Sequence, residues 1–250
     1  MARSDFERAF EFMLRGDLAG TRKEPWRFGA AVFTPELPLR HDSNYLVLER
    51  EGDPAELAAE AERAQAALGH RLILVPDAAL GERLAPAFER LGWEMQRFVV
   101  MAHRRAPERA VDTALTVEVD DETLRGPRER QTLSYPWATP EVARQLSDAR
   151  RLNPLETRFY AVLVEGEVAS FTDLYLDRDT AQVEAVVTLP EFRNRGYASA
   201  VVSRAVEEAR RAGAALIFLV ADASDWPKEL YRRLGFDEVG RYVKLGRVNP

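Results

Sequence analysis

The chain has 250 residues, which is enough for one large domain or two domains of ordinary size. Its net charge of −6 argues against a general nucleic-acid binder, and the lack of cysteine excludes disulfides, zinc–thiolate sites and cysteine nucleophiles. The first residues are charged and lack a signal-peptide core, and no apolar run approaches the roughly 20 residues that span a bilayer. We therefore expect a soluble, cytoplasmic protein with no membrane or nucleic-acid partner; a homodimer is left open.

The first half opens with a proline-rich stretch, residues 22–41, which we interpret as a loop reaching towards a partner or substrate. NYLVLE, at residues 44–49, is typical of a strand. A helix is predicted after it, with Asp53 as its N-cap, Pro54 in its first turn and Gly69 at its stop. The apolar face of this helix consists of Leu57, Ala61, Ala64 and Leu68.

The second half has a clearer pattern. Strand-like runs at residues 159–165, 168–176 and 183–188, separated by turn residues, predict an antiparallel meander. Apolar residues then recur at helical spacing and predict a helix that ends at Gly213. The run LIFLVA predicts a strand buried on both faces, KELYRRLG a second helix that ends at Gly235, and RYVKL a last strand.

The two halves share a pattern. RLILVPD…FERLGWEMQRFVV, from Arg71, parallels ALIFLVAD…YRRLGFDEVGRYVKL, from Ala215. Each gives an apolar strand ending in aspartate, a helix, a leucine–glycine–aromatic step and a final strand. We infer two related domains, although any two α/β segments can look alike. The polar, proline-containing segment 103–114 suits a boundary, which gives domains of residues 1–105 and 106–250.

RNRGYASAV, at residues 193–201, lies between a predicted strand and a predicted helix. A helix N-terminus offers backbone N–H groups without an internal partner and a partial positive charge, which together suit a phosphate. Gly196 lets the backbone approach a ligand closely, and Arg193 and Arg195 add positive charge. The alternative is a plain turn with solvated arginines.

Residues 193–198 resemble the R/Q-x-x-G-x-G/A signature of GNAT-type N-acetyltransferases, with alanine at the last position. VVTLPEF before them resembles that family's strand-then-proline approach, and ELYRRLGF resembles its LY-x-x-x-GF stretch. The resemblance covers residues 158–244. It implies an α/β fold of two GNAT-like domains in tandem, each a central mixed, mostly antiparallel sheet flanked by helices. In this fold two parallel strands splay apart, and acetyl-CoA enters the splay.

The resemblance also implies cofactor contacts. Those to pantetheine would come from Val186, Val187 and Thr188. The pyrophosphate would lie on Arg193, Asn194, Arg195, Gly196, Tyr197, Ala198 and Ser199. The chain departs from the family at Ser224, where an asparagine is common, and at Pro227, where a small residue is usual. Either Ser224 or another group makes that cofactor contact, or the contact is missing.

Acyl transfer to an amine needs a neutral amine, a donor for the developing oxyanion and a proton for the departing thiolate. Tyr231 matches the family's general acid; the alternative is a core tyrosine with a backbone partner. Glu184 is a lone carboxylate in an apolar strand, where burial would raise its pKa and suit a general base. The alternatives are that Glu184 faces solvent or that water serves as the base.

The first half lacks the equivalent features. Phe88 aligns with Tyr231, and Asp53 and Glu56 would repel a pyrophosphate at the start of the first-half helix. We therefore expect a degenerate first half that closes the acceptor site or braces the second.

The other polar and aromatic candidates can be explained by structural or surface roles. His41, His70 and His103 have no metal-ligand spacing, so we expect structural or surface histidines and no metal. Tyr135 and Trp137 suit either an acceptor pocket or the core.

These observations predict an N-acetyltransferase that moves an acetyl group from acetyl-CoA directly to a primary amine of a small molecule or peptide. The alternative is a non-catalytic acyl-CoA-binding or regulatory protein that keeps the fold. A scaffold without any nucleotide ligand is a further alternative. The acceptor itself is not specified by the sequence.

Overall fold

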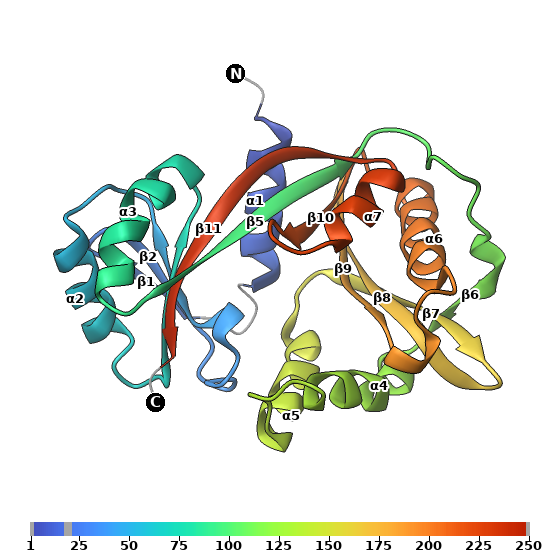
Figure 1. Ribbon diagram of the computed structural model, residues 1–250, viewed down its shortest axis with the longest axis horizontal. Helices are drawn as coiled ribbons and strands as arrows, with labels where there is room; N and C mark the ends of the chain where they lie inside the picture. Colours follow the sequence, from blue (N-terminus) through green and yellow to red (C-terminus); the bar gives the residue numbers. More distant parts are fainter. Residues whose placement is uncertain (1–2, 18–21, 249–250) are drawn as a thin grey trace.

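The computed structural model describes residues 3–17 and 22–248, and within them eleven strands form one continuous sheet (Figure 1). The first half contains α1 (Asp5–Asp17), β1 (Arg22–Trp26), β2 (Gly29–Phe33), β3 (Tyr45–Leu48), α2 (Pro54–Ala64), β4 (His70–Val75), α3 (Ala78–Arg90) and β5 (Glu94–His103). The second half contains β6 (Thr116–Val119), α4 (Asp121–Leu133), α5 (Pro140–Asp148), β7 (Glu156–Val164), β8 (Glu167–Asp177), β9 (Thr180–Thr188), α6 (Tyr197–Arg211), β10 (Leu216–Asp222), α7 (Pro227–Arg233) and β11 (Phe236–Val248). Short 3₁₀ turns add η1 (His41–Ser43) and η3 (Ala149–Leu152).

The repeat inferred from the sequence corresponds to a repeated strand–helix–strand–helix–strand unit. The order β3-α2-β4-α3-β5 in the first half returns as β9-α6-β10-α7-β11 in the second. In each unit the first two strands are parallel and joined by a helix, and the remaining sheet pairs are antiparallel. The expected mixed, mostly antiparallel α/β fold with two similar halves is therefore confirmed.

The two halves exchange their last strands. The sheet order is β1-β2-β3-β4-β11-β5-β10-β9-β8-β7-β6, so β11 pairs with β4 of the first half and β5 pairs with β10 of the second. The exchanged strands also pair with each other and run between the two lobes (Figure 1). The sequence boundary near residue 105 thus lies just after a strand that is hydrogen-bonded into the second half.

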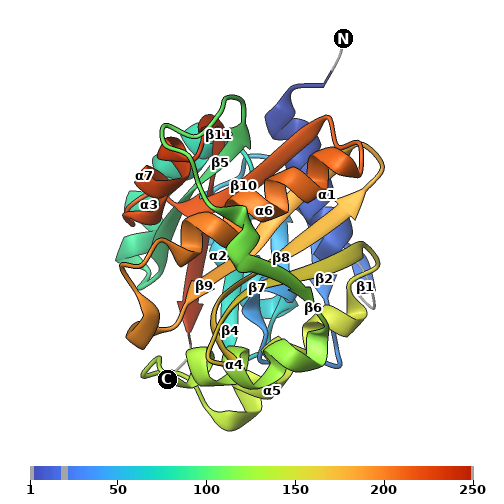
Figure 2. The ribbon, with the colours of Figure 1, turned by 90° about the vertical axis from the view of Figure 1, so that its right-hand side faces the viewer.

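Helices cover both faces of the sheet. Helices α2 and α3 cover one face in the first half, and α6 and α7 cover the same face in the second. Helix α1 packs in the middle of the opposite face through Ala9, Phe10 and Phe12, and it contacts strands of both halves. Figure 2 shows α6 across the second half's strands, with α4 and α5 at one end. Leu124 anchors α4 on the α1 side of the sheet.

Most predicted elements of the repeat are present, with small shifts at their ends. Asp53 caps α2 as predicted, because its Oδ1 accepts from Ala55 N at 2.9 Å and from Glu56 N at 3.2 Å. The helix ends at Ala64 rather than near Gly69. The interpretation of residues 22–41 as a loop reaching towards a partner or substrate was wrong over residues 22–33, where β1 and β2 form an antiparallel hairpin. Residues 34–40 do form a loop.

Candidate functional site

The parallel strands β9 and β10 separate after a short paired stretch. Their register runs only from Leu216–Thr180 to Phe218–Gln182. On its other edge β10 pairs with β5 from Phe218 to Asp222, while β9 continues along β8. Among the described residues, no strand pairs with this edge of β9 beyond Gln182, so its backbone groups are available to an extended ligand. The predicted pantetheine residues lie here, half-buried: Val186, Val187 and Thr188.

A β-bulge bends β9 at the mouth of this splay. The register with β8 shifts between Phe171 and Asp173, and Ala185 has a φ of 51°, a left-handed value that is unfavourable for a residue with a side chain. Hydrogen bonds to the β8 edge hold the bulge, because Thr172 Oγ1 donates to the Glu184 carbonyl at 2.8 Å. The bulge therefore changes the direction of β9 just before the predicted cofactor contacts begin.

The loop between β9 and α6 leaves the start of a long helix open. Gly196 is the N-cap with a φ of 80°, and no side chain caps the helix. A side chain at Gly196 would meet nothing within 4 Å, so the glycine is needed for its backbone conformation rather than for space. Arg193 folds back, its Nε donating to the Thr188 carbonyl at 3.3 Å. The predicted pyrophosphate residues surround this helix start: exposed Arg193, Asn194, Arg195 and Gly196, and half-buried Tyr197, Ala198 and Ser199.

This geometry fits a pyrophosphate. The first-turn N–H groups of α6 and its helix dipole favour an anion, and exposed arginines lie beside them. The splayed edge of β9 leads directly into the loop, so a long ligand can follow the strand and end at the helix.

The equivalent place in the first half is filled. The Asp53 carboxylate occupies the start of α2. A Cβ on Gly52 would lie 2.4 Å from the ring of Phe28, which shows how closely that ring covers the turn. Phe88, at the position aligned with Tyr231, is buried, and its ring meets that of Trp93 edge-on with centroids 5.1 Å apart. The residues of the first half therefore do not fit a pyrophosphate or an acid at this position.

Tyr231 lies on α7 and packs into the core between α6 and the splayed strands. Its ring meets Phe236 edge-on, with centroids 6.3 Å apart. Burial, together with the charges of Glu184 and Asp225, raises the pKa of Tyr231. The hydroxyl therefore stays protonated at neutral pH, as a proton donor must.

Glu184 faces a cavity rather than bulk solvent. Its neighbour Val183 points to the opposite, helix-covered face, as the alternation of a strand requires. Burial raises the pKa of Glu184, with a further contribution from the Asp173 charge. Gln182 Nε2 donates to Glu184 Oε2 at 2.7 Å, which orients the carboxyl group.

The cavity has a volume of about 410 Å³ and lies on the α1 side of the sheet, between the two halves. Residues of the first half and of the exchanged strand β11 make up much of its lining, so the first half does help to enclose the space beside the splay. Its charged lining residues are Arg40, Asp42, Arg150, Glu184, Asp222 and Lys244.

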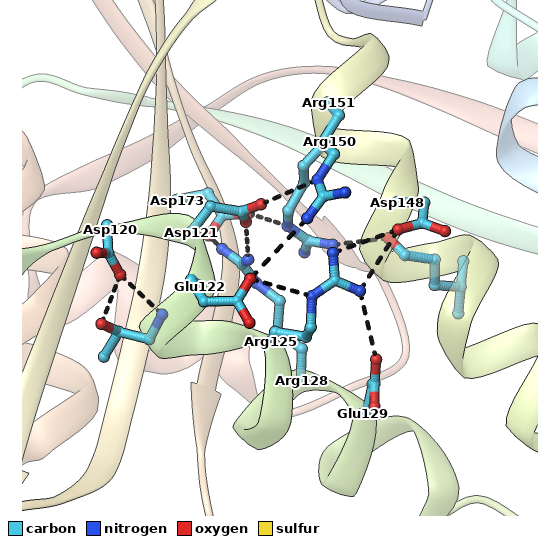
Figure 3. A network of polar contacts seen from close by, with 12 residues as sticks. Asp120, Asp121, Glu122, Arg125, Arg128, Glu129, Asp148, Arg150, Arg151 and Asp173 are labelled. Atoms are coloured by element: carbon cyan, nitrogen blue, oxygen red, sulfur yellow. Dashed lines mark hydrogen bonds and ion pairs between the residues drawn. The ribbon is translucent and has the colours of Figure 1, made fainter.

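A buried ion-pair network supports the cavity wall. Asp173 on β8 is 0% exposed and accepts from Arg128 Nη2 at 2.7 Å and from Arg150 Nε at 2.6 Å (Figure 3). Arg128 comes from α4 and Arg150 from η3, so one carboxylate joins both segments to the sheet. Tyr175, also in the cavity, donates to Asp173 Oδ2 at 3.4 Å.

Other candidates from the sequence lie outside this arrangement. Ser224 is exposed and donates its N–H and its hydroxyl to Asp222 Oδ1, at 2.7 and 2.5 Å. Tyr135 and Trp137 are 46% and 61% exposed and stack on each other, so they belong neither to the core nor to the cavity lining. The described residues include no group of three or more histidine, aspartate or glutamate side chains placed to bind a metal.

Sequence reasoning missed several cavity residues. The sequence did offer a signal for Asp222, because this aspartate follows an apolar strand in the same way as Asp77 does in the first half. Arg40 lies in the segment 22–41, which the sequence analysis did interpret as reaching towards a partner or substrate. Lys244 had no signal, since it belongs to a strand whose exchange was not foreseen. No helix in the described part of the chain has the length and apolar character to cross a bilayer.

Comparison with known proteins gives a family match within the second half. Residues 119–236 match the acetyltransferase (GNAT) family. Over 62 residues the chain is 34% identical to an uncharacterized N-acetyltransferase of Methanocaldococcus jannaschii, a match covering 24% of this chain and 27% of that protein.

Solved structures share the whole fold at low sequence identity. A conserved protein of unknown function from Staphylococcus epidermidis superposes with a TM-score of 0.74 at 16% identity, covering 93% of this chain and 96% of that one. A GCN5-related N-acetyltransferase from Kribbella flavida superposes with a TM-score of 0.64 at 17% identity, covering 100% of this chain and 98% of that one. A tandem GNAT protein from the clavulanic acid biosynthesis pathway superposes with a TM-score of 0.55 at 17% identity, covering 88% of this chain and 75% of that one. The second half of the chain thus matches the GNAT acetyltransferase family over residues 119–236, and the overall fold is shared with the solved tandem GNAT structure.

Proposed function

We propose that the chain is an acetyl-CoA-dependent N-acetyltransferase whose second half carries the chemistry. The observation that carries this proposal is the uncapped start of α6, with Gly196 at a φ of 80°, directly after the splayed and bulged strand β9. That combination occurs in the second half, whereas the Asp53 carboxylate fills the equivalent place in the first.

The second half's residues would hold the cofactor along one continuous path. The edge of β9 at Val186, Val187 and Thr188 would hydrogen-bond pantetheine, and the start of α6 would bind the pyrophosphate. Acetyl-CoA supplies an acetyl thioester, whose carbon–sulfur bond is exchanged for the carbon–nitrogen bond of an amide. The cavity beside Glu184 would hold the amine acceptor.

Two residues would handle the protons. Glu184, with its raised pKa, accepts the proton that the amine loses. Tyr231, which stays protonated, donates a proton to the departing sulfur. We expect kcat/KM to rise with pH through an apparent pKa above the ordinary 4.5 of a glutamate, and this limb should vanish in Glu184→Gln.

A second candidate is acyl-CoA binding without turnover. It is favoured by Ser224, whose hydroxyl is engaged by Asp222 instead of standing free for the cofactor contact expected at this position. The two candidates differ in one outcome. For the enzyme, Tyr231→Phe should lower kcat about 10²- to 10⁴-fold, the usual range for a general acid.

The first experiment is calorimetric titration with acetyl-CoA of the wild type and of Gly196→Glu. We expect micromolar binding that the variant abolishes, since it adds a carboxylate and strain at the anion site. Gly213→Glu is a matched control, because Gly213 has a φ of 86°, meets nothing within 4 Å and lies at the other end of α6. No binding by the wild type would refute the proposal.

A further inference from the structure

Half of the charged residues of the cavity form ion pairs within the protein. Lys244 Nζ donates to Asp42 Oδ1 at 2.6 Å, so these two charges balance. Arg150 is held by Asp173. Across residues 3–17 and 22–248, three charged cavity residues have no ion-pair partner: Arg40, Glu184 and Asp222.

Arg40 is a half-buried cation on a rigid loop of the first half. The buried amide of Asn44 donates to the carbonyls of Leu37 at 2.8 Å and Arg40 at 2.9 Å, which fixes the loop backbone. Leu39 N donates to Gln145 Oε1 at 2.9 Å, which ties the same loop to α5. Arg40 lines the cavity, where the charge of Lys244 and then that of Arg40 lower the pKa of Asp42, another lining residue. The Arg40 guanidinium carries a fork of donors that matches a carboxylate.

Glu184 and Asp222 approach the cavity from the two splayed strands. Both lie beyond the last pair that joins β9 to β10, next to the place where the proposed acyl donor enters. Two carboxylates at this point attract an ammonium group and leave it beside the reacting carbon.

The uncharged lining is mixed. Its apolar residues include Phe10, Leu14, Leu37, Phe98, Leu146 and Val220, and its polar residues include Thr34, Tyr45, Tyr175 and Gln182. A cavity of about 410 Å³ suits a small molecule. Its occupant should therefore carry an amine at one end and an anionic group at the other.

We propose that the acceptor is an amino acid or a similar small amino carboxylate, whose carboxylate pairs with Arg40 and whose amino group faces Glu184 and Asp222. The inference rests on the proposed acetyltransferase function. A diamine would place a second cation against Arg40, and a simple monoamine would leave Arg40 unpaired. The first half would thus determine acceptor specificity although it does not fit the cofactor.

The test compares acceptors that differ only in the carboxylate. Release of free CoA from acetyl-CoA is measured with L-phenylalanine against 2-phenylethylamine, and with L-leucine against 3-methylbutylamine. We expect the wild type to prefer the amino acids in kcat/KM by about 10- to 100-fold, the range for a charge-assisted hydrogen-bonded contact. Arg40→Gln should remove this preference by lowering kcat/KM for the amino acids and leaving that for the amines within about threefold.

Two controls separate recognition from folding. Arg63→Gln removes an exposed arginine that pairs with Glu60 outside the cavity, and it should leave the preference unchanged. Arg40→Lys keeps the charge without the fork and should fall between wild type and Arg40→Gln. Calorimetric binding of N-acetyl-L-phenylalanine should weaken in the same order, and melting curves show whether the variants fold.

The outcomes distinguish this inference from the proposed function. Equal use of both members of each pair, or equal loss for both in Arg40→Gln, overturns the amino carboxylate while the acetyltransferase stands. Acetyl-CoA binding with turnover of neither amino acid also overturns it. A wild type that does not bind acetyl-CoA overturns the proposed function itself.

Discussion

Replacing Asp173 with asparagine should strongly destabilise the protein. Asp173 is 0% exposed, and its two oxygens accept from Arg128 and Arg150, whose side chains are 5% and 17% exposed. Asparagine keeps one acceptor but turns an amide N–H₂ towards a guanidinium, which leaves Arg150 without a carboxylate partner and Arg128 with Asp121 alone. Breaking a buried pair in this way costs about 3–5 kcal/mol. For a chain of this size that corresponds to a fall in melting temperature of about 6–20 °C.

The assay is thermal unfolding followed by circular dichroism, with Asp148→Asn as the matched control. Asp148 pairs with Arg125 and Arg144 but its side chain is 25% exposed, so its loss should cost about 0–1 kcal/mol. If the two variants melt within about 2 °C of each other, burial does not govern this network and the reasoning is refuted. Asp173→Asn should also lower acetyl transfer, because Arg150 loses its anchor beside the cavity.

Three further predictions concern other parts of the fold. Asp53→Ala should cost about 1 kcal/mol in urea unfolding through the lost cap of α2, and acetyl-CoA titration should reveal no second site. Gly81→Ala should cost about 1–3 kcal/mol or more, because its Cβ would lie 2.1 Å from Val243 Cγ2; a neutral result would contradict this packing. Burial lowers the pKa of His70 and of His103 to about 4, so the unfolded state binds more protons than the folded state between pH 6.5 and 4. The free energy of unfolding therefore decreases as the pH is lowered through this range. Urea unfolding at pH 7 and 5 should show a smaller decline for His70→Gln than for the wild type.

The sequence predicted the repeated unit because its signals are local. The period of α6, the cap at Asp53 and the apolar run of β10 each depend on neighbours within one element. The exchange of β5 and β11 could not be predicted, since either strand satisfies the same pattern whichever parallel pair it joins. Helix α1 was also missed, although its apolar face at Ala9, Phe10 and Phe12 packs in the centre of the molecule.

The candidate site divides in the same way. The loop around Gly196 was found because its conformation, helix start and charge lie within a few consecutive residues. Glu184 was found as a polar exception in an apolar strand, but the alternation of a strand cannot tell a cavity from solvent. Arg40 was not singled out within the segment 22–41, because its role depends on a space that the two halves enclose together.

The exchanged strands also set the order in which the protein can be built. During synthesis β4 leaves the ribosome long before β11, its neighbour in the sheet, which occupies almost the last residues described. Until β11 is made, the strand His70–Val75, which is fully buried in the folded protein, has an edge whose backbone groups lack their partner strand. In the same way, β5 has no partner on one edge until β10 is made. The first half therefore cannot complete its fold as it emerges, so folding of both halves is concerted and late. A nascent or truncated chain offers that edge to other chains, and a second copy of β11 is the strand that fits it best.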